Sequence, residues 1–306
     1  MDNKITIVTA FFPLKRESWK GFERPNNKYL EYFEFWARIK NDMIIYTDEE
    51  TSKYIEEIRK EKYDRHNTKI VIISDWKELD KELYESIKIA TKNDINKEFH
   101  FNPGSPESWN YDYNYVMLLK EWCVKDAVEK GFAKGMIAWI DFGFNHGGEY
   151  YLKSEEFDFE WKWNFSNKIQ LFQINELDNL PIFEIVRRMN TYIQGDIIIA
   201  PDNLWLELWK LVKNNMIALN KVGLVDDDQT ILLMAYRENK EIFELHKSEW
   251  FSEIADCSQN KFTIRPKEEK NLKLLRNLKK TIKNRIKMKR YTNRWYNLLK
   301  NEETKG

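Results

Sequence analysis

The stretch "GMIAWIDFGFNHGG" at residues 135–148 places a carboxylate at the end of the most apolar predicted strand. The run from Met136 to Ile140 predicts a buried strand, and Asp141 follows it directly. A dry, unpaired charge is costly, so Asp141 must be paired, hydrogen-bonded or bound to a ligand. An isolated Asp-x-Gly more often caps a turn. Here two further glycines and His146 add open backbone and a ligand nitrogen, a combination that suits a diphosphate held with a divalent cation.

Strands and helices alternate along the chain on both sides of this stretch. Apolar runs predict strands at 4–12, 42–50, 69–75 and 195–201. Helical spacing of apolar residues predicts helices at 26–41, 113–132, 203–221 and 226–239. This alternation predicts an α/β fold, with a mixed, mostly parallel sheet flanked by helices. Ligands of such sheets lie at the carboxyl ends of the strands, which is where Asp141 stands.

Charge divides the chain into two predicted parts, a catalytic domain over residues 1–260 and a basic helical tail over residues 261–306. Residues 261–306 hold 16 basic and 4 acidic residues, whereas the whole chain has 50 of each sign. The body is therefore acidic and the tail basic. The apolar positions along one face of the tail helix are Leu275, Leu278, Ile282 and Ile286. We expect this basic amphipathic helix to bind an anionic membrane surface, and docking on the acidic body is the alternative.

Composition also bears on location and partners. A content of 42% hydrophobic residues is ample for a core, and the two cysteines, Cys123 and Cys257, fit a reducing cytosol. The N-terminus has no signal-peptide pattern, and no run reaches the roughly 18 apolar residues of a membrane span. We expect a cytoplasmic protein, peripheral on the inner face of the cytoplasmic membrane. We expect no nucleic-acid partner, because no recognition motif accompanies the basic charge.

A second acidic cluster, Asp226-Asp227-Asp228, opens the predicted helix at 226–239. One acid would be enough to cap that helix, and three adjacent acids repel one another. We therefore expect one of the three acids to act as a general base for a hydroxyl nucleophile. His246 follows another short apolar run and is a candidate metal ligand, although a lone histidine is more often structural.

Five segments in this order resemble the HtrL/YibB family of bacterial proteins over most of residues 5–250. The segments are "ITIVTAFF", "KYLEYFEFWARIKNDMIIYTDE", "YNYVMLLKEWCVKDAVEKGF", "AWIDFGF" and "DDDQTILLMAYREN". That family resembles glycosyltransferases of the GT-A type, whose members tend to belong with surface-polysaccharide or lipopolysaccharide assembly. The resemblance implies a GT-A-like fold, a nucleotide-sugar donor such as a UDP-sugar, and a glycan or lipid-linked acceptor.

The resemblance also implies roles for particular residues. The donor would contact the end of the first strand, two arginines and the "WIDFGF" stretch, at Thr9, Ala10, Phe11, Phe12, Arg16, Arg24, Asp141 and Gly143. GT-A enzymes carry a D-x-D motif at that place, and this chain has Gly143 instead of the second acid. The metal, Mn²⁺ or Mg²⁺, would then be held by Asp141 and His246, or Lys and Arg would neutralise the leaving diphosphate instead.

Asp227 and Asp228 fall where GT-A enzymes place the acceptor-side carboxylate, which implies an inverting single displacement. The string "DDDQTI" also resembles the D-Q-D pattern of retaining glycogenin-like transferases, so both stereochemical outcomes stay open. Two other functions compete with sugar transfer. A nucleotidyltransferase would use the same nucleotide cradle, and a protein that has lost catalysis would only bind a glycan or an assembly partner. Gly143, in place of the second acid, keeps the latter alternative open.

Overall fold

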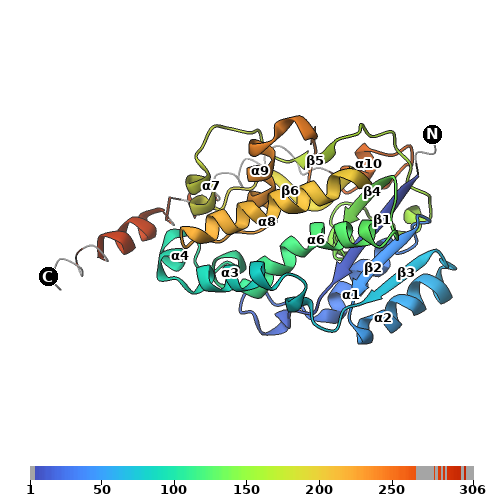
Figure 1. Cartoon of the computed structure of the whole chain (residues 1–306), viewed down its shortest axis with the longest axis horizontal. Coiled ribbons are helices and arrows are strands. Elements are labelled where there is room, and N and C mark those ends of the chain that lie inside the picture. Colours follow the sequence, from blue (N-terminus) through green and yellow to red (C-terminus); the bar gives the residue numbers. More distant parts are fainter. Residues whose placement is uncertain are drawn as a thin grey trace.

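The computed structural model describes residues 4–266, 279, 282–283, 285–286, 288–297 and 300. In this part of the chain seven strands form one sheet with helices on both faces (Figure 1). The strands are β1 (Ile5–Phe11), β2 (Met43–Thr47), β3 (Thr68–Ile72), β4 (Met136–Ile140), β5 (Ile169–Gln173), β6 (Ile193–Pro201) and β7 (Phe243–Lys247). The strand order is β3-β2-β1-β4-β6-β5-β7.

One strand, β6, runs against all the others. It pairs antiparallel with both β4 and β5, whereas β1, β2, β3 and β4 pair in parallel, as do β5 and β7. The predicted mixed, mostly parallel sheet flanked by helices is confirmed. Because β6 is reversed, its first residues lie at the edge where the other strands end.

The helices form a layer on each face of the sheet. Buried side chains place α3 (Lys81–Lys92), α6 (Tyr111–Glu129), α7 (Ile182–Arg188), α8 (Trp205–Lys221) and α9 (Asp228–Glu238) in one layer. The other layer holds α1 (Asn26–Trp36), α2 (Glu49–Glu56), α10 (Glu253–Asp256) and part of the segment between β4 and β5. Two shorter helices, α4 (Asp94–Phe99) and α5 (Pro106–Trp109), lie between α3 and α6 in the chain.

The core follows the two-residue period of the strands. Val8 of β1 packs into the layer that contains α6, and Ile7 packs into the layer that contains α1. Ile44 and Ile45 divide in the same way on β2. Strands buried on both faces read as continuous apolar runs, which is why the sequence predicts them well.

Predicted and observed boundaries agree closely at the elements that matter for the site. The predicted helix at 113–132 becomes α6, and Gly131 adopts a positive φ of 69° just beyond its end. The predicted helix at 26–41 is shorter in the structure and ends at Trp36. There the chain turns away so that Asn41 can bind neighbouring backbone.

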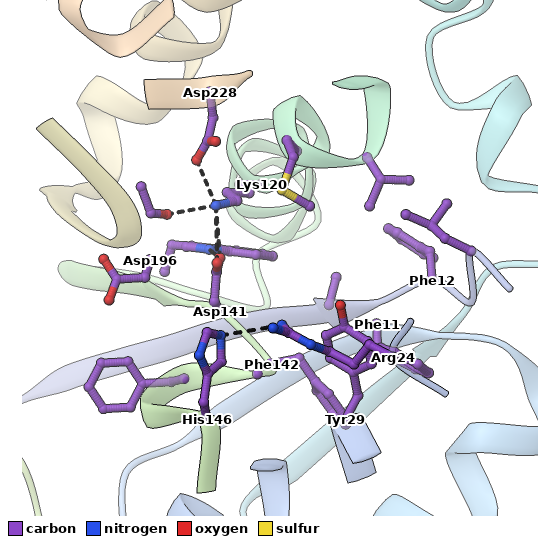
Figure 2. Close-up of a pocket in the computed structure, with 18 of the residues that line it drawn as sticks. Phe11, Phe12, Arg24, Tyr29, Lys120, Asp141, Phe142, His146, Asp196 and Asp228 are labelled. Atoms are coloured by element: carbon purple, nitrogen blue, oxygen red, sulfur yellow. Dashed lines mark hydrogen bonds and ion pairs between the residues drawn. The ribbon is translucent and has the colours of Figure 1, made fainter. Parts of the chain in front are cut away.

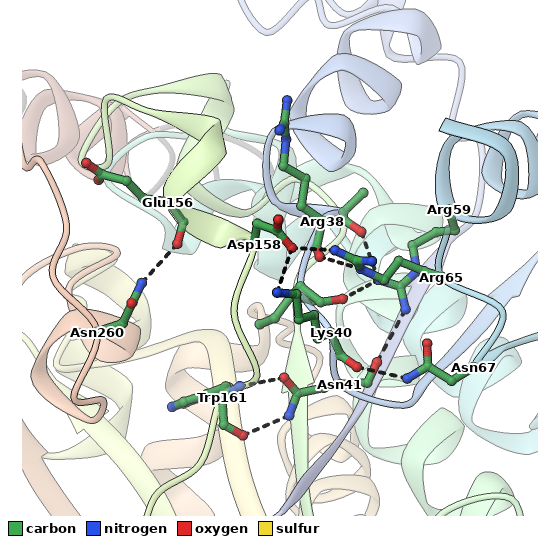
Figure 3. Close-up of polar contacts among 12 residues, drawn as sticks. Arg38, Lys40, Asn41, Arg59, Arg65, Asn67, Glu156, Asp158, Trp161 and Asn260 are labelled. Atoms are coloured by element: carbon green, nitrogen blue, oxygen red, sulfur yellow. Dashed lines mark hydrogen bonds and ion pairs between the residues drawn. The ribbon is translucent and has the colours of Figure 1, made fainter. Parts of the chain in front are cut away.

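A cluster of polar side chains holds the segment after α1 against the sheet (Figure 3). The amide of Asn41 donates to the carbonyls of Ile5 and Trp161 at 2.8 Å each and accepts from the Trp161 amide at 2.7 Å. The buried guanidinium of Arg59 donates to the carbonyls of Ala37 and Ile39 at 2.8 and 2.6 Å. These contacts satisfy buried backbone groups of β1, of the segment after α1 and of the Trp161 segment.

Replacing Asn41 with alanine should destabilise the protein by about 3 kcal/mol, because buried backbone groups lose their partners. Chemical denaturation of Asn41→Ala measures this loss. Asn67→Ala is the matched control, since the Asn67 amide is exposed and donates to Lys40 and Asp42. An equal effect of the two variants would contradict a special role for Asn41.

The C-terminal part of the chain is helical at its described residues beyond 278. Ile282 and Ile286 are exposed there, and Leu275 and Leu278 lie outside the described residues. Further along, Tyr291 stacks against Phe101 of the body with ring centroids 4.8 Å apart. The predicted boundary at residue 260 stays a prediction. Among the described helices, none has the length and apolar character needed to cross a membrane.

Candidate functional site

The reversed direction of β6 brings two aspartates together at the carboxyl edge of the sheet (Figure 2). Ile140, the last residue of β4, pairs with Ile197 of β6. The next amide, that of Asp141, donates to the carbonyl of Asp196 at 2.8 Å. Asp141 and Asp196 therefore come from strands that run in opposite directions, yet they lie side by side.

Lys120 lies at the centre of this edge, on the buried side of α6. Its ammonium lies 2.9 Å from Asp141 Oδ1 and 2.7 Å from Asp228 Oδ2. It also donates to the carbonyl of Gly195 at 2.8 Å. An ammonium has three donors and no acceptor, so these three groups use all of its hydrogens. Burial lowers the pKa of Lys120, but the charges of Asp141 and Asp228 outweigh it and raise the pKa above its usual value.

Gly195 allows this close contact. A Cβ atom at residue 195 would lie 1.8 Å from Asp228 Oδ2 and 3.3 Å from Lys120 Nζ. Any side chain there would separate the backbone of β6 from the ion pair. The glycine is therefore required by packing, although its φ is not positive.

Asp141 is held by two donors. Trp139 Nε1 donates to its Oδ1 at 2.7 Å, and the ammonium of Lys120 lies 2.9 Å from the same oxygen. Burial raises the pKa of Asp141, and the positive charge of Lys120 opposes that rise. Asp141 is tolerated at the end of β4 because it forms a buried ion pair and accepts a hydrogen bond from an indole.

Asp196 and Glu253 form a second group of acids with different surroundings. Both side chains are buried, and none of their carboxyl oxygens has a hydrogen-bond partner among the described residues. Burial and the charge of Asp141 raise the pKa of Asp196 to about 7. Burial, and next the charge of Asp196, raise the pKa of Glu253 well above its usual value. Unpaired buried carboxyl groups are costly and occur preferentially at functional sites.

A cavity of about 580 Å³ opens at this edge of the sheet. Lys120, Asp141, Asp196 and Asp228 line one end of it. The other lining residues come mainly from β1, the segment that follows it, and the loop after β4, and include Ala10, Phe11, Phe12, Arg16, Arg24, Tyr29, Phe142, Gly143 and His146. Its size is in the range of small-molecule sites.

Two arginines lie among the aromatic side chains of the cavity. Arg16 Nη1 donates to the Tyr29 hydroxyl at 2.6 Å, and its guanidinium lies 4.9 Å from the Trp19 ring centroid. Arg24 lies 5.5 Å from the ring centroid of Tyr29 and 3.3 Å from His146 Nε2. No carboxylate ion pair is formed by either guanidinium in the described part of the structure, so both charges can serve an anion.

The loop after β4 has a structural explanation of its own. Asn145 and His146 adopt positive φ values of 59° and 42°. The Asn145 side chain accepts from the amides of Tyr150 and Tyr151 at 2.7 and 2.9 Å and thereby closes the turn. A Cβ atom at Gly143 would lie 3.2 Å from the Tyr29 ring, so a second acid there would require that ring to shift.

The structure brings most of the predicted site residues to one cavity. Asp228 and seven of the eight predicted donor-binding residues line it, namely Ala10, Phe11, Phe12, Arg16, Arg24, Asp141 and Gly143. Thr9 is buried within β1 and does not line the cavity. Asp227 does not line it either, because its carboxylate caps α9 by accepting from the Gln229 amide.

His246 is not near Asp141, which corrects the predicted metal pair. It lies on β7, three strand spacings from β4, a separation of about 14 Å. Its Nε2 lies 2.7 Å from Gln170 Oε1, and its ring packs against Phe172. A single cation cannot bridge Asp141 and His246 at that distance.

A divalent cation does not fit between the two site carboxylates that face each other, because the ammonium of Lys120 already lies between Asp141 and Asp228. No group of three or more His, Cys, Asp or Glu side chains suited to a metal ion occurs in the described ranges of the chain.

Sequence reasoning missed Lys120 and Asp196. Lys120 lies four residues after Val116 and three before Cys123, on the apolar stripe of the predicted helix, and a cation in such a stripe is a usable signal. Asp196 opens the apolar run "DIIIAP". Its place at the site depends on the direction of β6, which the local sequence does not encode.

The fold and site define an α/β protein with a polar cavity at the carboxyl edge of a mixed sheet. The chain belongs to the HtrL_YibB family, described as "bacterial protein of unknown function", whose model matches residues 3–256. It is 30% identical over 269 residues to Protein HtrL of Escherichia coli (strain K12), which covers 82% of this chain and 91% of that protein.

Three solved structures show weaker similarity, with TM-scores below 0.5 that carry no inference about activity. Mouse xyloside xylosyltransferase 1 has a TM-score of 0.43 at 12% identity and covers 79% of this chain and 84% of its own. A glycosyltransferase involved in the glycosylation of the major capsid of PBCV-1 has a TM-score of 0.37 at 11% identity. The match covers 80% of this chain and 81% of that one. The 4-diphosphocytidyl-2C-methyl-D-erythritol synthase of Anaerococcus prevotii has a TM-score of 0.33 at 14% identity. The match covers 81% of this chain and 89% of that one.

The buried acids predict how stability depends on pH. Glu121 is buried in α6, and burial raises its pKa to about 8. A carboxyl group with a raised pKa in the folded state binds its proton more tightly there than in the unfolded chain. Its contribution to stability is therefore present at low pH and is lost as pH rises from about 4 to about 8.

Glu121→Gln should flatten this loss, so the variant should gain melting temperature relative to the unaltered protein at pH 8 and little at pH 5. Thermal unfolding across this pH range measures the effect. Glu129→Gln, at the exposed end of the same helix, is the matched control. If the melting temperatures of Glu121→Gln and the unaltered protein change in parallel with pH, the raised pKa of Glu121 would be contradicted.

Proposed function

We propose that this protein is a glycosyltransferase that moves a sugar from a nucleotide-sugar donor, a UDP-sugar, to an acceptor hydroxyl. One observation carries the proposal. One cavity at the carboxyl edge of the sheet holds, at one end, two arginines that have no carboxylate partner among the described residues, and at the other end buried carboxylates. Sugar transfer needs both, because the leaving diphosphate must be stabilised while the acceptor hydroxyl loses its proton.

The nucleotide is assigned to the end of the cavity that holds the arginines and aromatic rings. Phe11 and Phe142 stack with centroids 5.0 Å apart, and both line the cavity. A flat base can pack against such rings. Arg16 and Arg24 can then donate paired hydrogen bonds to the diphosphate, because a guanidinium matches phosphate oxygens in a fork geometry.

The proton acceptor is assigned to Asp196 in preference to Asp228. Asp227, the other candidate from the sequence, caps α9 outside the cavity. Asp228 already forms an ion pair through its Oδ2 with Lys120 at 2.7 Å. Asp196 has no partner among the described residues, lines the cavity, and has its pKa raised to about 7 by burial and the charge of Asp141. A base works best with a pKa near the working pH.

In the proposed inverting step the acceptor oxygen forms a bond to the anomeric carbon. The bond from that carbon to the diphosphate oxygen breaks, and its electron pair leaves with the nucleoside diphosphate. The hydroxyl proton passes to the Asp196 carboxylate, and Arg16 and Arg24 stabilise the charge on the leaving group. The acceptor we propose is a glycan or lipid-linked glycan of surface-polysaccharide or lipopolysaccharide assembly, as the family resemblance implies.

Arg24→Gln should weaken the binding of UDP by about tenfold or more, because a charged hydrogen bond to the diphosphate is lost. Isothermal titration calorimetry with UDP measures the affinity. Arg38→Gln is the control, since Arg38 stacks on Tyr63 and does not line this cavity. UDP binding that is equally strong in Arg24→Gln and the unaltered protein would remove the diphosphate from this end of the cavity.

Asp196→Asn should lower kcat by about a hundredfold or more with little change in UDP affinity. The base must be deprotonated, so kcat should rise with pH through a midpoint near 7 in the unaltered protein. Asp202→Asn, at the opposite end of β6, should keep both rate and profile. A pH profile that survives in Asp196→Asn would assign the base elsewhere, with Asp228 as the next candidate.

For the tail we propose contact with an anionic membrane surface. Ile282 and Ile286 are exposed one helical turn apart and are interleaved with Lys283 and Arg285. Such a face can bury its apolar residues at the headgroup boundary while its cations meet anionic lipid. Further along the chain Tyr291 packs against Phe101 of the body, whereas Ile282 and Ile286 are exposed.

Replacing Ile282 and Ile286 together by serine should weaken sedimentation with vesicles that contain anionic lipid, and added salt should weaken it for the unaltered protein. Ile89→Ser is the control, because Ile89 is an exposed isoleucine on α3. Equal sedimentation of the serine double variant and the control would end the membrane proposal.

A further inference from the structure

A divalent cation commonly neutralises a diphosphate at an acidic site, so the arrangement around Lys120 raises the question of what supplies the positive charge here. The only side-chain cation in contact with both Asp141 and Asp228, among the described residues, is the ammonium of Lys120. It comes from α6 and lies between the carboxylates of Asp228 and Asp141 in Figure 2, where Arg24 lies beyond Asp141.

We propose that the ammonium of Lys120 takes the place of a divalent cation between Asp141 and Asp228, so that the cavity binds a nucleoside diphosphate without a metal ion. This inference rests on the proposed function for its ligand. Whether the chain's own carboxylates bind a metal ion can be tested without any nucleotide.

The geometry leaves no coordination position between the two acids. Both oxygens of Asp141 lie within 3.2 Å of Lys120 Nζ, and Oδ1 also accepts from Trp139. On Asp228, Oδ2 lies 2.7 Å from the same ammonium. A cation entering here would have to displace a buried positive charge that it also repels.

The position of Lys120 is built into the surrounding elements. The Lys120 side chain is 4% exposed, so water cannot replace its partners. The third hydrogen bond, to the Gly195 carbonyl, ties the ammonium to β6. A Cβ atom at residue 195 would overlap Asp228, so the backbone is shaped around the ion pair. Lys120 remains charged, because Asp141 and Asp228 raise its pKa despite its burial.

Lys120 and the two arginines of the cavity have different roles. Lys120 neutralises carboxylates, and its three hydrogens are already used, so it is a positioning residue and does not bind phosphate. The charge of the diphosphate falls to Arg16 and Arg24, whose guanidinium groups face the same cavity. Gly143, in place of a second acid, leaves Asp141 as the carboxylate from this loop, and Lys120 already binds it.

The test uses the full chain and two probes, Mn²⁺ and UDP. Electron paramagnetic resonance should detect no Mn²⁺ bound in the unaltered protein. Calorimetry should give UDP affinities that differ by less than about twofold between excess Mn²⁺ and excess EDTA. Stoichiometric Mn²⁺ binding that is lost in Asp141→Asn, or a loss of UDP affinity of about tenfold or more in EDTA, would overturn the proposal.

The second part of the test measures Mn²⁺ binding by Lys120→Ala. Lys125→Ala is the control, because Lys125 lies on the same helix and pairs with Glu129. Removing the ammonium leaves two facing carboxylates, so Lys120→Ala should acquire a Mn²⁺ site, whereas Lys125→Ala should not. A folded Lys120→Ala that binds no Mn²⁺ would count against the ammonium as the replacement. If Lys120→Ala does not fold, the result for the unaltered protein decides. Absence of UDP binding under all conditions would contradict the proposed function and leave the Mn²⁺ titration to decide this inference.

Discussion

The ion pair of Lys120 with Asp141 and Asp228 is the contact on which the arrangement of the site depends. It joins α6, β4 and α9, and its bond to the Gly195 carbonyl adds β6. Buried ion pairs contribute little net stability, but removing one partner costs roughly 3–5 kcal/mol. An apolar residue in place of Lys120 would therefore leave two uncompensated charges in the floor of the cavity. The lysine is best explained by what it holds in place.

The direction of β6 is the second constraint. In a fully parallel sheet the start of this strand would lie at the opposite edge, and Asp196 would be far from Asp141. The reversal brings a carboxyl group with no described partner beside one that is fully bound. One acid is fixed and charged, and the other is able to exchange a proton near neutral pH. Different surroundings thus give two adjacent aspartates different chemical roles.

Much of the sheet could be predicted from the sequence, because strands buried on both faces leave uninterrupted apolar runs such as those of β1 and β4. Asp141 could be found for the same reason, since a charge at the end of such a run is conspicuous. Asp196 could not be found in this way, because the apolar run "DIIIAP" does not indicate the direction in which the strand runs in the sheet. His246 was expected at the site because it follows an apolar run. Strand order, which is set by packing over the whole chain, puts it on a distant strand.

The most direct measurement is the identification of the products that the purified protein forms from a panel of nucleotide sugars and short saccharide acceptors. We expect release of a nucleoside diphosphate together with a lengthened acceptor, and the loss of both in Asp196→Asn. Release of pyrophosphate would indicate nucleotidyl transfer in place of sugar transfer. Tight nucleotide-sugar binding without any product, across acceptors, would indicate a protein that binds glycans or partners and performs no catalysis.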